Sequence, residues 1–240
     1  MGVPCQIAGL YGYLKKDYDE LVTVDIICHG MPPAIYLKQH LESVERDKKE
    51  YTSILHFRDP KYKTSTYTFT LKNKSGKEFY KKQVLTCDNY QLGYHRALIY
   101  RENCYHCSYA RKERISDLTI GDFSGLGRFA PFENDKMDVS CVLQNTTKGA
   151  ELLASLDSAL TKHERPGCEA FEVEKLLKAP SVKHEGRDVF ESVYRDSQNF
   201  VLASNAALRG EKRKAMKRTL VLKCRYIARL VLTSCHLKKD

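Results

Sequence analysis

The sequence has little that would place the protein in a membrane or outside the cell. It contains no tryptophan, no apolar run of about 18 or more residues and no signal peptide at Met1-Gly2-Val3-Pro4. It also lacks internal repeats, heptads and low-complexity linkers, which excludes a fibrous protein. The 240 residues that remain are 42% hydrophobic and 10% aromatic, enough for one sizeable α/β domain or two small ones in the cytoplasm.

Most of the chain has no excess of positive charge. The formal net charge is +10, but residues 209–240, the basic tail, hold eleven Lys or Arg and two acidic residues. The rest of the chain is close to neutral, so we expect no specific nucleic-acid partner. Apolar residues recur at helical spacing within the tail, which fits either of two helices. One lies on an anionic membrane surface or an acidic partner, and the other is solvated and packs on the domain.

Hydrophobic periodicity alternates between that of strands and that of helices. This pattern predicts an α/β fold with a mostly parallel sheet, flanking helices, a small antiparallel insertion and a helical basic C-terminal tail. We expect one domain over residues 1–180 and a helical extension over 181–240. The expected helices cover 6–14, 34–48, 91–100, 147–160, 171–178 and 188–208, and the expected strands cover 21–27, 53–57, 66–72, 77–82, 117–121 and 139–144.

Nine cysteines, an odd number without a signal peptide, do not indicate a disulfide scaffold. Polar landmarks follow three predicted strands: Cys5, Cys28 with His29, and Asp122. Because ligands bind beyond the carboxyl ends of parallel strands, these residues would share one edge of the sheet. Cys5 also begins a helix, where the helix dipole favours a thiolate. The alternative is that Cys5 and Cys28 are ordinary buried cysteines.

Cys104 and Cys107 form a Cys-x-x-Cys motif in a polar loop. Alone, this motif is half a zinc site or a redox dithiol. With Cys5 and Cys28 it supplies the four thiolates of either a tetrahedral zinc site or a four-iron cluster, and the count does not choose between them. Cys87 is the only plausible replacement ligand. The other cysteines are weaker candidates: Cys141, Cys168, Cys224 and Cys235.

Four motifs in a fixed order carry a resemblance to a known family. They are Gly2–Leu10, Val24–Pro32, Cys104–Cys107 and Ser116–Phe123. Over roughly residues 2–180 the chain resembles the C-terminal domain of the coenzyme F420 hydrogenase/dehydrogenase beta-subunit family. Members are iron–sulfur flavoproteins that pass electrons between a cluster, FAD and a hydride-carrying substrate such as reduced deazaflavin.

The resemblance implies specific roles for eight residues. It implies that the ligands of a [4Fe-4S] cluster are Cys5, Cys28, Cys104 and Cys107. It also implies that the residues near the flavin or substrate are His29, Gly30, Gly121 and Asp122. His29 is the candidate catalytic residue, as a proton donor, and His106 is a second one. The implied partners are a redox protein or an upstream ferredoxin-like domain, and a small-molecule hydride donor or acceptor.

The chain departs from the family pattern in three respects. The N-terminal domain that precedes the motifs in the family is absent before Met1, Ser124 stands where an aromatic residue is expected, and the basic tail is not part of the motif set. We therefore expect the chain alone to be an incomplete enzyme that binds FAD weakly. The alternative function is a non-catalytic, zinc-stabilised module whose basic tail contacts a partner or a membrane.

Overall fold

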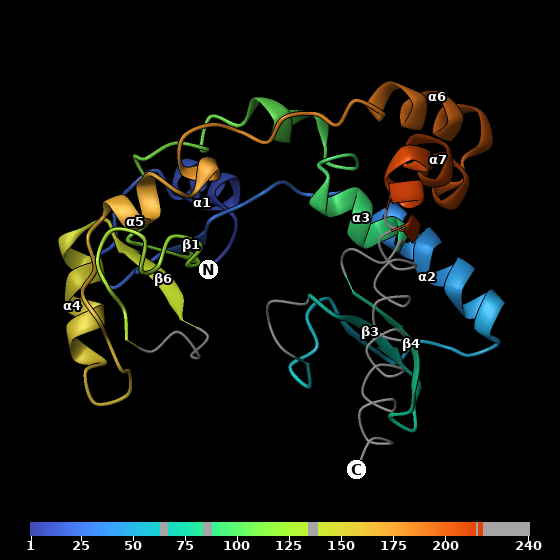
Figure 1. Ribbon diagram of the computed structural model, residues 1–240. Coiled ribbons are helices and arrows are strands. Elements are labelled where there is room, and N and C mark those ends of the chain that lie inside the picture. The colour runs from blue at the N-terminus through green and yellow to red at the C-terminus, as the bar shows by residue number, and fades with distance from the viewer. Residues whose placement is uncertain (63–66, 84–87, 134–138, 215, 218–240) are drawn as a thin grey trace, which may run out of the picture. The chain divides into compact units, whose positions relative to one another are not determined.

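The structure is a computed structural model that describes residues 1–62, 67–83, 88–133, 139–214 and 216–217 (Figure 1). The chain forms two compact units. The first contains Met1–Met31 and Arg101–Val182, and the second contains Pro32–Tyr100 and the residues from Lys183 onward. The division at residue 180 stays a prediction. It lies close to Val182, where the chain leaves the first unit, but the sequence patterns did not indicate that 32–100 pack with the C-terminal helices.

The first unit is built on a mixed sheet in the order β1-β5-β6. β1 pairs in parallel with β5, and β5 pairs antiparallel with β6. Gly2 adds a parallel bridge to Asp25 of β1. The α/β class and the parallel pairing are confirmed, and the third strand reverses direction. The strands are β1 (Val24–Ile26), β5 (Leu118–Asp122) and β6 (Ser140–Gln144).

The helices of this unit begin where local chemistry satisfies their first N–H groups. Pro4 opens α1 at a position where its missing N–H has no cost. The hydroxyl of Thr146 accepts a hydrogen bond from the Gly149 N–H and caps α4, as its sequence predicts. The helices are α1 (Pro4–Leu14), α4 (Thr147–Ser155) and α5 (Cys168–Phe171), with 3-10 turns η2 (Glu102–His106) and η3 (Lys175–Leu177).

Over its described residues, the second unit combines helices with an antiparallel sheet in the order β2-β3-β4. The expected antiparallel insertion is therefore confirmed. The strands are β2 (Ile54–His56), β3 (Phe69–Lys72) and β4 (Glu78–Lys82), and the helices are α2 (Ala34–Lys48), α3 (Asn89–His95), α6 (Arg187–Ser197) and α7 (Phe200–Ala207). α3 is shorter than expected.

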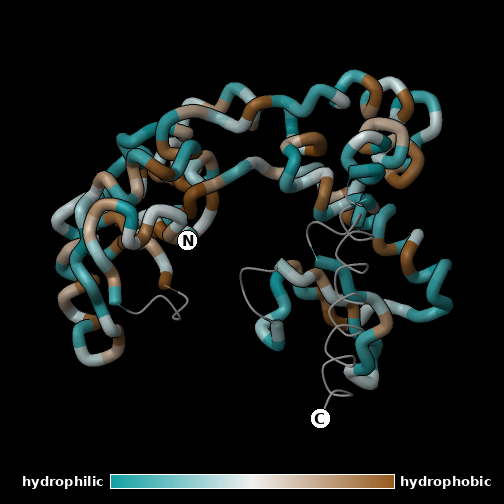
Figure 2. Tube along the Cα trace, viewed as in Figure 1, coloured by the Kyte–Doolittle hydropathy of each residue, from teal (hydrophilic) through white to brown (hydrophobic). Residues whose placement is uncertain are grey.

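The expected single helix over 188–208 is wrong in its middle, where two helices meet. Gln198 adopts a left-handed conformation with φ 49°, and the side chain of Asn199 accepts a hydrogen bond from the Leu202 N–H to start α7. The break allows Phe190 of α6 and Phe200 of α7 to be fully buried in one aromatic core. In Figure 2 hydrophobic and hydrophilic residues alternate along α6, as expected for a helix with one buried face, whereas α7 begins with the hydrophobic run Phe200-Val-Leu-Ala.

Candidate metal centre

The parallel strands β1 and β5 end at the same edge of the first sheet. Ile26 pairs with Ile120, and the N–H of Ile27 extends the ladder by donating to the Ile120 carbonyl at 2.9 Å. Cys28 and Asp122 each follow that pair by two residues. The structure therefore places both at the carboxyl end of the sheet, where parallel sheets bind ligands.

Two further segments bring the other cysteines to the chain around Cys28. The Gly2 bridge to β1 leads directly into α1, whose first turn carries an exposed Cys5. Met31 links the loop after Cys28 to the Cys-x-x-Cys motif, because its N–H donates to Cys104 Sγ at 3.3 Å. Its carbonyl accepts from the Arg101 N–H at 2.9 Å. Cys104 lies in η2, and Cys107 follows it.

The electrostatic surroundings of Cys28 consist largely of other thiols. Burial raises the pKa of the Cys28 thiol to about 11, and a hydrogen bond from the Gly30 N–H opposes this rise. The thiols of Cys104, Cys107 and Cys5 then raise the pKa further. Over the described residues, however, no three Cys, His, Asp or Glu side chains are gathered tightly enough to ligate one metal ion. The four cysteines are therefore electrostatic neighbours that do not form a metal-binding group in this structure.

The loop from Cys28 to Met31 holds its backbone in a conformation that requires glycine. Gly30 is buried and has φ 142°, in a region that residues with a Cβ rarely adopt. Its N–H bonds to the Cys28 thiol, and the hydroxyl of Ser181 donates to the His29 carbonyl at 2.6 Å. Two backbone N–H groups of this loop, those of Gly30 and Met31, thus point at cysteine sulfurs.

The remaining predicted residues lie in different environments. A Cβ on Gly121 would lie 2.8 Å from Cδ1 of Ile27, so the structure gives this glycine a packing role at the sheet edge. His29 and Asp122 are exposed at the same edge. His106 is 75% exposed and lies 3.8 Å from Glu102.

The other cysteines do not join this group in the part of the chain that the structure describes. Cys141 belongs to β6 and is buried in the core, and burial raises its pKa to about 11. Cys168 is exposed at the start of α5. Cys87, the replacement candidate, lies outside the described residues, as do Cys224, Cys235 and most of the basic tail.

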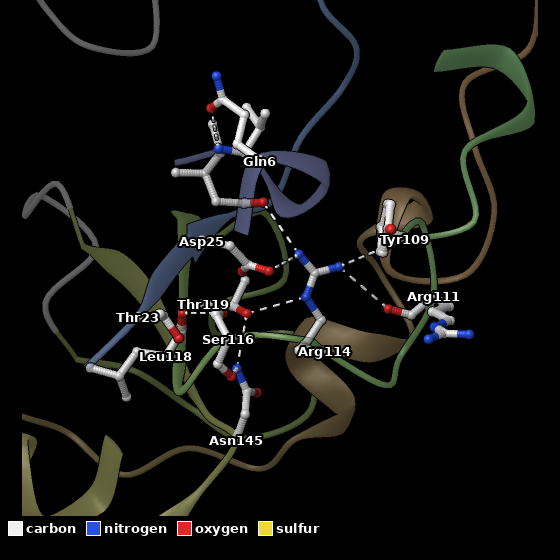
Figure 3. Close-up of polar contacts among 12 residues, drawn as sticks. Gln6, Thr23, Asp25, Tyr109, Arg111, Arg114, Ser116, Leu118, Thr119 and Asn145 are labelled. Atoms are coloured by element: carbon white, nitrogen blue, oxygen red, sulfur yellow. Dashed lines mark hydrogen bonds and ion pairs between the residues drawn. The ribbon is translucent and has the colours of Figure 1, made fainter. Parts of the chain in front are cut away.

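A buried ion pair lies beneath the cysteine edge, where the sequence patterns indicated only a basic patch over residues 111–114. Figure 3 shows Arg114 turned inward toward Asp25, with 3.0 Å between Nη2 and Oδ2. The side chains are 3% and 0% exposed. The signal that could have revealed the pair was Asp25 itself, since a carboxylate in a buried strand requires a charged partner.

The loop that follows Asp122 and Phe123 is fastened by one buried carboxylate. Oε1 of Glu169 accepts N–H bonds from Gly127, Phe129 and Ala130, and it pairs with Arg165 at 2.8 Å. The hydrogen bonds from Arg165 hold the pKa of Glu169 at about 2. The loop is therefore ordered by an ionised group at neutral pH.

Replacing Glu169 by glutamine tests this fastening. Because the pKa falls from its ordinary value of 4.5 to about 2 on folding, the ionised carboxylate stabilises the fold above pH 4.5, and this contribution is lost as the pH falls toward 2. Glu169→Gln should lower the thermal midpoint at neutral pH, and the difference from the parent should shrink to nothing near pH 2. Thermal unfolding followed across this range measures it, with the exposed Glu164→Gln as control. A difference that does not change with pH would contradict the assignment.

Together these features define an α/β domain with a cysteine-rich edge at the carboxyl end of its parallel strands. The sequence profile of a family described as the C terminus of the beta subunit of coenzyme F420 hydrogenase/dehydrogenase matches residues 1–166. The chain belongs to this family, and the resemblance drawn from the four motifs is confirmed. The family description is that of one subunit of a multi-subunit redox enzyme, which gives the chain an oxidoreductase-related role.

The other comparisons add no relative. Neither the curated proteins nor the solved structures gave a match. In the described part of the chain, no helix is both long and apolar enough to cross a membrane.

Proposed function

We propose that this chain is the electron-transferring part of an iron–sulfur flavoprotein oxidoreductase, with Cys5, Cys28, Cys104 and Cys107 as ligands of a [4Fe-4S] cluster. The observation that carries the proposal is that the Met31 N–H, in the loop after Cys28, donates to Cys104 Sγ, while Cys5, Cys104 and Cys107 each lie close enough to Cys28 to raise the pKa of its thiol. Four thiolates would repel one another in a half-buried site, and bound iron would offset that repulsion.

A zinc ion and a four-iron cluster require different spacings of the four thiols. In a tetrahedral zinc site all four sulfurs lie about 2.3 Å from the metal. A four-iron cluster places its own irons and sulfides between the cysteines, so its ligands stand farther apart. The resemblance to a family of iron–sulfur flavoproteins favours the cluster. The N–H bonds to Cys28 and Cys104 are also of the kind that tunes cluster potentials.

The same edge of the sheet is the proposed place for the flavin and the hydride-carrying substrate. A bound FAD would supply the exchange between two-electron hydride transfer and one-electron transfer. Gly30, Gly121 and Asp122 would line this region, and His29 would hold or release a proton at its exposed imidazole. The electrons would pass to or from a redox partner protein or a ferredoxin-like domain. Contact of the basic tail with a membrane surface stays a prediction.

Purification of the full chain without oxygen tests the cluster. We expect a brown protein with broad visible absorbance and about four irons per chain. A colourless protein with one zinc would overturn the proposal and favour a zinc-stabilised binding module. Titration with FAD, followed by flavin fluorescence, tests the second cofactor separately, and weak binding by this chain alone is the expected result.

A further inference from the structure

The side chain of Arg114 bonds to both of the chain segments that flank the Cys28 and Cys-x-x-Cys sulfurs. On one side, Nη2 donates to Asp25 Oδ2 at 3.0 Å and to the Ile26 carbonyl at 3.3 Å. On the other side, Nη1 donates to the Tyr109 carbonyl at 2.9 Å. Nε donates to Thr119 Oγ1 of β5 at 3.1 Å. Figure 3 shows these bonds radiating from one guanidinium group.

These partners lie close in sequence to the cysteines. Asp25 and Ile26 belong to β1 and precede Cys28 by three and two residues, while Tyr109 follows Cys107 by two. A guanidinium group is planar, with donors in a fixed fork, so bonds on both of its sides fix the separation of the groups that accept them. Arg114 therefore sets how far the end of β1 lies from the Cys-x-x-Cys loop.

Burial keeps this arrangement in place. Asp25 is fully buried, and its other oxygen, Oδ1, has no hydrogen-bond partner among the described residues. Movement of Arg114 away from Asp25 would leave a buried carboxylate without its cation, which is strongly unfavourable. The neighbouring Arg111 and Lys112 are exposed, so the inward position is particular to Arg114.

We infer that Arg114 is a positioning residue, which holds the Cys104–Cys107 loop in register with β1 and so with Cys28. The inference rests on the proposed function for the role of the cysteines, but the geometry that it describes exists without a metal. If Arg114 were only part of a solvated basic patch, its replacement would leave the positions of the cysteines unchanged. If it is a positioning residue, its replacement should change them.

The test uses Arg114→Lys in the full chain. Lysine keeps a positive charge beside Asp25, but its single ammonium cannot reach β1 and the Tyr109 carbonyl in the same fixed geometry. The matched control is Arg165→Lys, which alters another arginine of the same unit, 15% exposed and ion-paired with the buried Glu169. Circular dichroism and thermal unfolding establish that each variant is folded.

Three measured quantities report on the cysteines. In the iron-free chain, a short bifunctional thiol reagent joins Cys28 to Cys104 or Cys107, and peptide mapping gives the yield of each cross-link. After anaerobic reconstitution, iron content and the cluster's reduction potential are measured. We expect Arg114→Lys to lower the cross-link yield several-fold, to lower iron content and to shift the potential of any cluster that forms. Arg165→Lys should match the parent in all three.

The outcomes separate this inference from the proposed function. A parent chain that binds no iron overturns the proposed function alone, because the cross-links report thiol positions without metal. A folded Arg114→Lys chain with parental cross-link yields overturns the inference. Should Arg114→Lys fail to fold, the double variant Asp25→Leu with Arg114→Met removes both charges together, a change that buried ion pairs often tolerate. The same loss of cross-links is then expected, and its absence counts against the inference.

Discussion

A chain with Cys28→Ser should lose most of its iron. The other three thiols all raise the pKa of Cys28, and a serine hydroxyl replaces a soft thiolate with a poor ligand for iron. Loss of a residue that merely hydrogen-bonds to a metal ligand costs roughly 10–100-fold in affinity, and loss of the ligand itself should cost more. Iron content after anaerobic reconstitution measures the effect.

Cys141→Ser is the matched control, since burial raises the pKa of the Cys141 thiol as it does that of Cys28, but Cys141 belongs to β6 and packs in the core. It should lower stability and leave the iron content per folded chain unchanged. Serine at Cys5, Cys104 or Cys107 should act as at Cys28. Parental iron in Cys5→Ser would remove Cys5 from the set and direct attention to Cys87.

Local signals predicted the elements that form the cysteine edge. Pro4 at the start of a helix, the β-branched run of β1 and the short strand pattern of β5 each act over a few neighbouring residues. Strand ends then located Cys28 and Asp122, because the carboxyl ends of parallel strands share an edge. The direction of β6 was not predictable in this way, since periodicity identifies a strand without its neighbour.

The composition of the second unit depends on contacts that a local pattern does not contain. Tyr36 of α2 packs on Phe190 and Phe200, with ring centroids 5.3 and 5.4 Å away. Helical periodicity predicted a helix over 188–208, which contains both phenylalanines, but did not identify α2 as their partner. The break at Gln198 was missed because neither glycine nor proline marks it, and tertiary packing stabilises an otherwise unfavourable left-handed residue.

Arg114 shows the same limit for the candidate site. In sequence it is one of several basic residues in a polar loop, and only its position in space distinguishes it from Arg111. The informative residue was its partner, because Asp25 interrupts a strand that is otherwise suited to burial. A charge at such a position predicts a buried counter-charge, although it does not say which of the many basic residues provides it.

Gly121→Ala is expected to destabilise the first unit and to lower iron content with it. An added Cβ would lie 2.8 Å from Cδ1 and 3.1 Å from Cβ of Ile27, the residue immediately before Cys28. Relief of this overlap has to move the end of β1, and overpacking of this kind costs about 1–3 kcal/mol. Urea unfolding gives the loss of stability, and iron content reports the displacement of Cys28.

Two further variants decide whether Gly121 acts through packing or at a cofactor. Gly9→Ala in α1 is the control, because no atom lies within 4 Å of an added Cβ there, and alanine should stabilise the helix by about 0.5–1 kcal/mol. Ile27→Val removes the methyl group nearest the clash, so combining it with Gly121→Ala should destabilise less than the sum of the two single changes. Strictly additive effects would contradict the contact with Ile27, and full stability in Gly121→Ala with iron or residual FAD binding lost would show that Gly121 serves a cofactor. If the double variant regains both stability and iron content relative to Gly121→Ala, the glycine keeps Cys28 in place by allowing β1 and β5 to approach.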